Sequence, residues 1–167
     1  ISFDPKFATN RYLYLYYTTV GGKNRLSRFR ASATNRNLVE QGSELPMLEM
    51  PALSGSHNGG ASHFGNDGYL YLSVGDGLTG SNAQNLGNLY GKILRLDPAN
   101  FPDNFIPSTN PFVGQPGARG EIWAYGFRNA FTFGIDPVTG DINVNDVGKS
   151  TWEEINRVFK GANYGWA

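Results

Sequence analysis

The sequence predicts an all-β protein made of short antiparallel strands, organised as part of a β-propeller. Aromatic residues make up 14% of the chain, and 22 glycines and 9 prolines punctuate it, a composition typical of short strands joined by tight turns. One pattern, a phenylalanine, then a turn signal, then an alternating strand, occurs within residues 2–18, 62–76 and 133–148. Propeller blades have ~40–50 residues, so we expect about three four-stranded blades, fewer than a closed ring needs.

The first strands follow from period-two alternation of side chains. Residues 11–19 alternate leucine with tyrosine, so both faces are apolar, which is typical of a strand packed on two sides. Residues 24–32 are predicted to be its hairpin partner across a Gly-Gly turn.

Similar alternation of side chains occurs along the rest of the chain. Further strands are expected within 69–77, 91–98 and 140–148, and two within 121–136. Residues 151–159 favour either a strand or a short turn of helix. Residues 99–120, rich in Pro, Asn and Gly, are predicted to form a long loop on one rim.

Composition excludes several classes of function. Lys plus Arg and Asp plus Glu number 14 each, so the net charge gives no reason to expect nucleic acid or an anionic membrane as a partner. The absence of cysteine excludes disulfides, zinc-thiolate sites and a thiol nucleophile. No apolar run approaches the ~20 residues of a membrane span. The chain begins at Ile1 with strand-like sequence, so we expect a longer natural protein.

The two histidines, His57 and His63, flank an Asn-Gly-Gly turn. Tandem glycines allow close approach of a ligand to the backbone, so His57 is a candidate general base; the alternative is a histidine that hydrogen-bonds turn amides. His63 enters a strand beside Phe64, which favours a structural role. A shared transition metal is disfavoured because zinc sites commonly space histidines about three to five residues apart and add further His or Cys ligands.

Two other stretches contain side chains that could bind a ligand, through oxygen atoms in one and a positive charge in the other. Residues 141–146, DINVND, imitate the start of a calcium loop but lack its glycine and its final glutamate, which favours a strand with a polar outer face. Arg128 and Asn129 lie between aromatic runs, where a guanidinium needs a partner. Two partners remain open: a planar, multiply oxygenated anion, or a carboxylate at Asp76, Asp136 or Asp146.

Five motifs, taken in order from Phe3 to Trp166, resemble the glucose/sorbosone dehydrogenase family. These are soluble quinoproteins that use pyrroloquinoline quinone (PQQ) and calcium on a six-bladed propeller. The motifs are HNGGASHFGNDGYLYLSVGDG (57–77), YGKILRLDP (90–98), EIWAYGFRNAFTFGIDPVTG (121–140), NDVGKSTWEEIN (145–156) and GANYGWA (161–167).

The resemblance implies a role for five residues. His57 matches the base that takes a proton from the C1 hydroxyl of an aldose while hydride passes to the quinone. Arg128 and Asn129 match the pair that contacts PQQ. Gly148 and Lys149 match the residues whose main-chain oxygens hold calcium, a cation that prefers such ligands and polarises the quinone.

This sequence departs from the family pattern in three ways. Ala61 and Ser62 replace an Arg-apolar pair, and Lys149 stands where Gln or Pro is common. The resemblance also implies a first blade before Ile1 and further blades after the final motif, which we expect to lie outside this sequence. We therefore expect residues 1–167 to be a single partial propeller domain, completed by missing blades or a second chain, with little or no activity alone. The resemblance implies a periplasmic or secreted parent acting on a small aldose.

Two alternatives belong to other classes. Some relatives of this family are extracellular binding propellers that use no quinone, so a non-catalytic protein- or sugar-binding module is the second hypothesis. A metal-dependent lactonase propeller, whose site relies on converging carboxylate and Asn ligands, is the third. His57, Arg128 and the Gly148 loop favour the quinoprotein.

Overall fold

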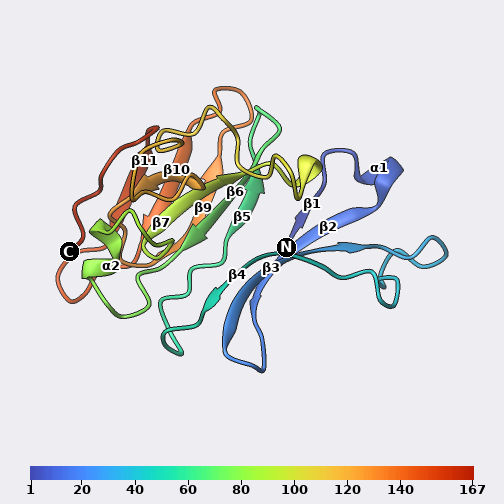
Figure 1. Ribbon diagram of the computed structural model, residues 1–167, viewed down its shortest axis with the longest axis horizontal. Helices are drawn as coiled ribbons and strands as arrows, with labels where there is room; N and C mark the ends of the chain where they lie inside the picture. Colours follow the sequence, from blue (N-terminus) through green and yellow to red (C-terminus); the bar gives the residue numbers. More distant parts are fainter. The chain divides into compact units, whose positions relative to one another are not determined.

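The computed structural model describes residues 1–167 and divides the chain into two compact units, Ile1–Ala52 and Leu53–Ala167 (Figure 1). Both units are built from antiparallel sheets, so the predicted all-β class is confirmed. The helical turns are short: α1 (Phe7–Asn10), α2 (Ser81–Gln84) and the 3-10 turn η1 (Pro98–Asn100). None of them has the length and apolar character that crossing a membrane requires.

The first unit is a four-stranded sheet. Its strands are β1 (Ser2–Phe3), β2 (Tyr12–Thr18), β3 (Lys23–Arg30) and β4 (Leu45–Pro51), in that order across the sheet. The predicted hairpin of β2 and β3 is confirmed in continuous register. The edge strand β4 escaped prediction because two prolines and a glutamate interrupt its alternation, and prolines are tolerated at a sheet edge.

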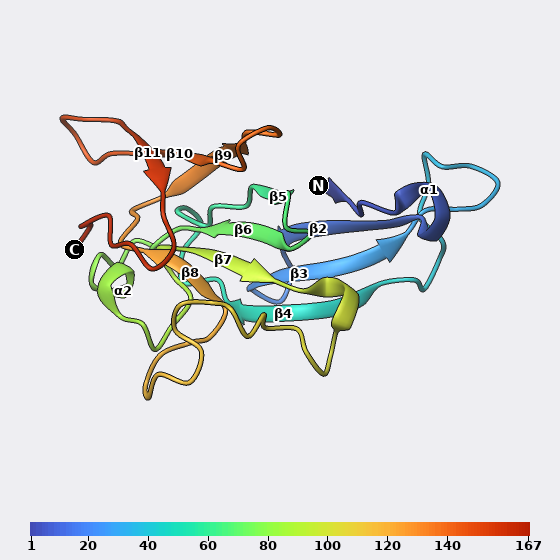
Figure 2. The same cartoon turned by 90° about the horizontal axis from the view of Figure 1, so that it is seen from above.

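The second unit contains two sheets, seen clearly apart in Figure 2. One has the order β5-β6-β7-β8, and the other has the order β11-β10-β9. Their bounds are β5 (Ser62–Phe64), β6 (Leu70–Val74), β7 (Lys92–Leu96), β8 (Ile122–Tyr125), β9 (Ala130–Ile135), β10 (Ile142–Asp146) and β11 (Glu154–Val158).

The structure tests three predictions about this unit. The third sheet has three strands in this chain, where four were expected. The stretch 151–159 forms strand β11 and not a helical turn. The DINVND stretch forms β10, with Ile142 and Val144 buried, as the strand interpretation predicted.

A common apolar core joins the two sheets of the second unit. Its buried members come from both sheets and from the crossing between them: Tyr71, Ile93, Ala124, Phe127, Ala130, Phe133, Ile142, Val144 and Val158. The ring of His63 packs edge-to-face on Phe133 at 5.0 Å between centroids, which gives that histidine the structural role expected of it. Arg128 and Asn129 connect β8 to β9, so the core places them where one sheet passes into the other.

The predicted long loop 99–120 is also present. Apart from the end of η1 it carries no regular element. The buried amide of Asn110 fastens the loop to the sheet, because it donates to the main-chain oxygens of Arg95 and Gly120 at 2.9 and 2.8 Å. The guanidinium of Arg95 is itself buried, over the rings of Tyr69 and Trp123.

Lys92 is a fully buried lysine on the central strand β7. Its Nζ donates to the main-chain oxygens of Asn82, Ala83 and Tyr90 at 2.8, 3.0 and 2.6 Å. These bonds tie the turn containing α2 to the sheet. Burial lowers the pKa of Lys92 to about 7.

Replacing this lysine should remove a pH dependence of stability. Between about pH 7 and the unfolded lysine pKa of ~10.4, the unfolded chain holds a proton at Lys92 that the folded chain has lost. The free energy of unfolding should therefore rise with pH in this window, by up to about 1.4 kcal/mol per pH unit. Urea titrations of wild type and Lys92→Met at several pH values measure the difference. Exposed Lys160, as Lys160→Met, is the control, and equal slopes in all three proteins would contradict the prediction.

Candidate active site

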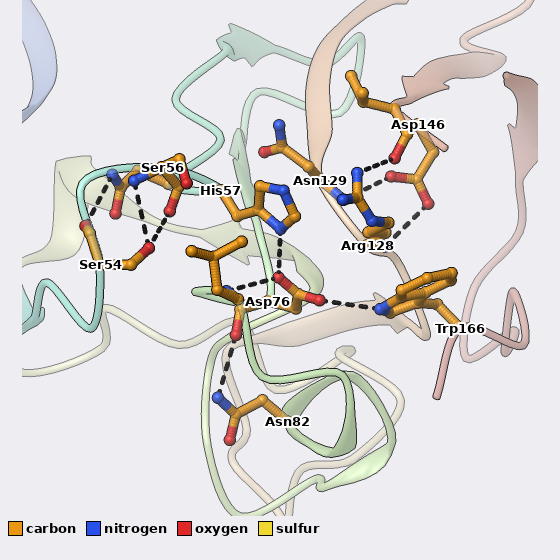
Figure 3. A network of polar contacts seen from close by, with 12 residues as sticks. Ser54, Ser56, His57, Asp76, Asn82, Arg128, Asn129, Asp146 and Trp166 are labelled. Carbon is orange, nitrogen blue, oxygen red and sulfur yellow. Dashed lines mark hydrogen bonds and ion pairs between the residues drawn. The ribbon is translucent and has the colours of Figure 1, made fainter. Parts of the chain in front are cut away.

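His57 and Asp76 form a close, shielded pair (Figure 3). His57 Nδ1 lies 2.7 Å from Asp76 Oδ1, and the two side chains are 12% and 3% exposed. His57 has a φ of 56°, in the left-handed region that few non-glycine residues adopt. Its second ring nitrogen points away from Asp76 (Figure 3). A carboxylate on Nδ1 favours the tautomer in which Nε2 accepts a proton.

The Asp76 carboxylate gathers donors from three segments of the second unit. Oδ1 also accepts the main-chain N–H of Leu78 at 2.9 Å, and Oδ2 accepts the indole N–H of Trp166 at 2.8 Å. The main chain of Asp76 is held as well: its N–H donates to Arg128 O at 2.8 Å, and its O accepts from Asn82 Nδ2 at 3.0 Å. Asp76 is therefore fixed in position before any ligand arrives.

Gly75 lets His57 and Asn129 approach each other. A Cβ at this position would lie 2.2 Å from His57 O and 2.8 Å from Asn129 Oδ1. Only a residue without a side chain fits between them. The glycine of the VGDG stretch thus brings the end of β6 against both the histidine loop and the crossing from β8 to β9.

Arg128 is held by main-chain oxygens. Its Nη1 donates to Val147 O at 3.0 Å and to Gly148 O at 2.8 Å. The main-chain N–H groups of Arg128 and Asn129 donate to the two carboxylate oxygens of Asp146, at 3.0 and 2.7 Å. The guanidinium thus forms no salt bridge with the carboxylates that the sequence left open. Burial raises the pKa of Asp146.

Asn129 has a buried side-chain oxygen without a hydrogen-bond partner. Buried polar atoms in folded proteins almost always have partners, so such an atom needs a reason. This one lies close to Gly75, and the side chain that carries it lies beside His57 (Figure 3). An amide at this position is poised to bond a ligand that enters next to the histidine.

A cavity of about 320 Å³ opens beside Arg128. Lys149 lines it, together with the rest of the 147–152 loop, Glu154, Tyr164 and Trp166. The loop is tight, because the N–H of Gly148 donates to Glu153 Oε2 at 2.9 Å and a Cβ on Gly148 would collide with Trp152 O. Nowhere in the chain do three His, Asp or Glu side chains gather as a metal site would need. A cation here would depend on main-chain oxygens.

Comparison with known proteins identifies the family. A family model described as glucose/sorbosone dehydrogenase matches residues 1–167. The chain belongs to the glucose/sorbosone dehydrogenase family. The aldose sugar dehydrogenase YliI of Escherichia coli is 36% identical over 97% of this chain and 43% of that protein.

Two further relatives bear on function. The PQQ-bound structure of an aldose sugar dehydrogenase from Streptomyces coelicolor superposes with a TM-score of 0.82 at 30% identity, over 98% of this chain and 46% of that one. Human Hedgehog-interacting protein is 30% identical over 87% of this chain and 23% of that protein. The chain spans less than half the length of each of these three relatives. Matching the propellers of PQQ dehydrogenases confirms the predicted architecture.

All five site residues that the sequence predicted lie in the second unit. His57 and Asn129 meet around Gly75, and Arg128 bonds Gly148. Lys149 lines the adjacent cavity.

Sequence reasoning missed two members of this group. Asp76 was considered only as a partner for Arg128, and Trp166 carried no role although both lie in quoted motifs. Their contact joins residues 90 positions apart, which no local pattern reveals.

A methyl group at Gly75 should disrupt the site. Gly75→Ala places Cβ against main-chain atoms of His57 that cannot move independently, so we expect a loss of about 1–3 kcal/mol in the free energy of unfolding. Gly134→Ala in β9 is the control, because nothing lies within 4 Å of its Cβ. Urea denaturation of both variants tests this, and equal stability of the two would contradict the close approach.

Proposed function

We propose that this chain is the part of a PQQ-dependent aldose dehydrogenase that carries its general base and part of its cofactor site. The observation that supports this most is the shielded His57–Asp76 pair next to the unpartnered amide oxygen of Asn129. When bound, PQQ supplies a two-electron acceptor for hydride. Arg128 fits such a planar polyanion, because its fork can donate paired hydrogen bonds to carboxylate or quinone oxygens.

His57 would act on the substrate as a base. Nε2 takes the proton of the C1 hydroxyl, while Asp76 holds the ring and stabilises the imidazolium that forms. Loss of that proton and of hydride from C1 converts a cyclic aldose into its lactone. The hydroxyl proton would go to His57, and the C1 hydrogen would leave as hydride, for which bound PQQ would supply the acceptor.

Calcium is the second group we propose, held by the main-chain oxygens of Gly148 and Lys149. Calcium prefers oxygen ligands, and carbonyls serve it well. The cationic Nη1 of Arg128 already lies between two carbonyl oxygens of this loop, which supports the chemistry of a cation site there. A cation on Gly148 O would compete with that guanidinium.

The parent protein, on this proposal, acts on a small aldose in the periplasm or outside the cell. Further blades, or a second chain, would complete the ring and the cofactor pocket. The 167 residues alone would then turn over sugar weakly or not at all.

A second candidate function is a binding propeller without a quinone. The 30% identity to Hedgehog-interacting protein favours it. The metal-dependent lactonase is the third candidate, and its site would need carboxylate and Asn ligands that converge at the centre of the ring. PQQ binding separates the quinoprotein from both alternatives.

PQQ should bind this chain through Arg128. Titration in the presence of calcium, followed by the visible spectrum of the quinone, should give a saturable change. Arg128→Met should weaken binding at least tenfold, the effect of about 1.4 kcal/mol. Arg157→Met is the matched control, since Arg157 is exposed and pairs with Asp141 at 2.7 Å. Absence of a spectral change, or an equal loss of PQQ affinity in both variants, would contradict the proposal.

Calcium alone should bind the Arg128 variant more tightly than wild type. Arg128→Met frees the Gly148 oxygen of a competing positive charge. Isothermal titration with calcium chloride measures this without PQQ, and Arg157→Met should match wild type. Equal or weaker calcium binding by Arg128→Met would contradict the shared use of this carbonyl.

A further inference from the structure

Trp166 touches both halves of the candidate site (Figure 3). Its Nε1 donates to Asp76 Oδ2 at 2.8 Å, and its ring lies 5.4 Å from the Cζ of Arg128. The residue therefore connects the histidine pair with the guanidinium that borders the cavity. It also lines that cavity.

The backbone of Trp166 is fixed independently of these contacts. Its N–H donates to Gly126 O at 3.0 Å, and its O accepts from Gln84 Nε2 at 2.6 Å. The Gln84 and Asn163 side-chain amides also bond each other in both directions, at 2.8 and 3.0 Å. The main chain that carries the indole is thus held by hydrogen bonds at both its N–H and its O, so the indole can restrain the groups it contacts.

The carboxylate of Asp76 needs such a restraint. Oδ1 receives His57 and the N–H of Leu78, so only the Trp166 bond engages Oδ2. A carboxylate bonded at both oxygens cannot rotate without breaking a charge-assisted hydrogen bond. Without the indole, Oδ2 would be buried and unbonded, and the carboxylate would be free to turn away from His57.

We propose that Trp166 is a positioning residue that keeps Asp76 Oδ1 on His57 Nδ1 and steadies Arg128 beside the cavity. This role rests on the proposed function, in which His57 is the base. The attraction between the guanidinium and the indole face adds to the second effect. Trp166 itself touches no reacting group in this account and acts through Asp76 and Arg128.

The other tryptophans provide matched controls. Trp123 has a buried Nε1 without an acceptor, so Trp123→Phe removes an indole N–H but breaks no hydrogen bond. Trp152 is 78% exposed and its indole reports on solvent. Trp166→Phe keeps an aromatic ring while removing the donor to Asp76.

The rate at which the His57 Nδ1 proton exchanges with water tests this role, and NMR measures that rate on the chain without PQQ. Trp166→Phe should speed this exchange about tenfold, as the loss of one charge-assisted hydrogen bond implies. Trp123→Phe should leave it at the wild-type rate. An unchanged rate in Trp166→Phe, or equal acceleration in both variants, overturns the positioning role.

A reciprocal measurement does not require the tryptophan variant to fold. His57→Asn, a residue that tolerates the left-handed backbone, should shift the indole N–H resonance of Trp166 and leave that of Trp152 in place. An unmoved Trp166 resonance overturns the proposal. Neither NMR result depends on PQQ. The PQQ titration can therefore contradict the proposed function while the NMR results support the role of Trp166, and the opposite outcome is equally distinguishable.

Discussion

The buried carboxylate of Asp76 is the interaction on which the candidate site depends. A negative charge at 3% exposure is unfavourable unless donors surround it. Those donors come from the histidine loop, from the turn after β6 and from the end of the chain. Satisfying one carboxylate therefore draws three distant segments together and sets the orientation of His57.

Close backbone approach is the second constraint. Gly75 leaves room for His57 and Asn129 to meet, and Gly148 leaves room for the carbonyl loop to fold against Trp152. Both glycines lie beyond the ends of strands whose cores are packed, β6 and β10. The packed core of the second unit thus supports loops whose close contacts depend on glycine. Lys92 adds to this support by bonding three carbonyls of the turn that carries Asn82.

The alternation of side chains along the sequence predicted the β2–β3 hairpin. It also distinguished β10 from a calcium loop, because burial of every second side chain can be seen in the local sequence. Strand β4 was missed, since its prolines break the pattern and its pairing with β3 is decided at long range. The same distinction holds at the site. A histidine beside tandem glycines is visible in the sequence, whereas its partner Asp76 and the link to Trp166 arise only when the sheets pack. The carboxylate partner considered for Arg128 was wrong, because its Nη1 bonds two main-chain oxygens that no sequence pattern predicts.

In the proposed function, Asp76 orients His57 so that Nε2 can accept a proton. The most direct measurement is the tautomer of the neutral His57 ring, from the nitrogen chemical shifts of the labelled imidazole, with His63→Gln to assign the signals. We expect a protonated Nδ1 and an unprotonated Nε2 in the wild-type chain, and a loss of this preference in Asp76→Ala. A ring protonated at Nε2 in the wild-type chain would contradict it.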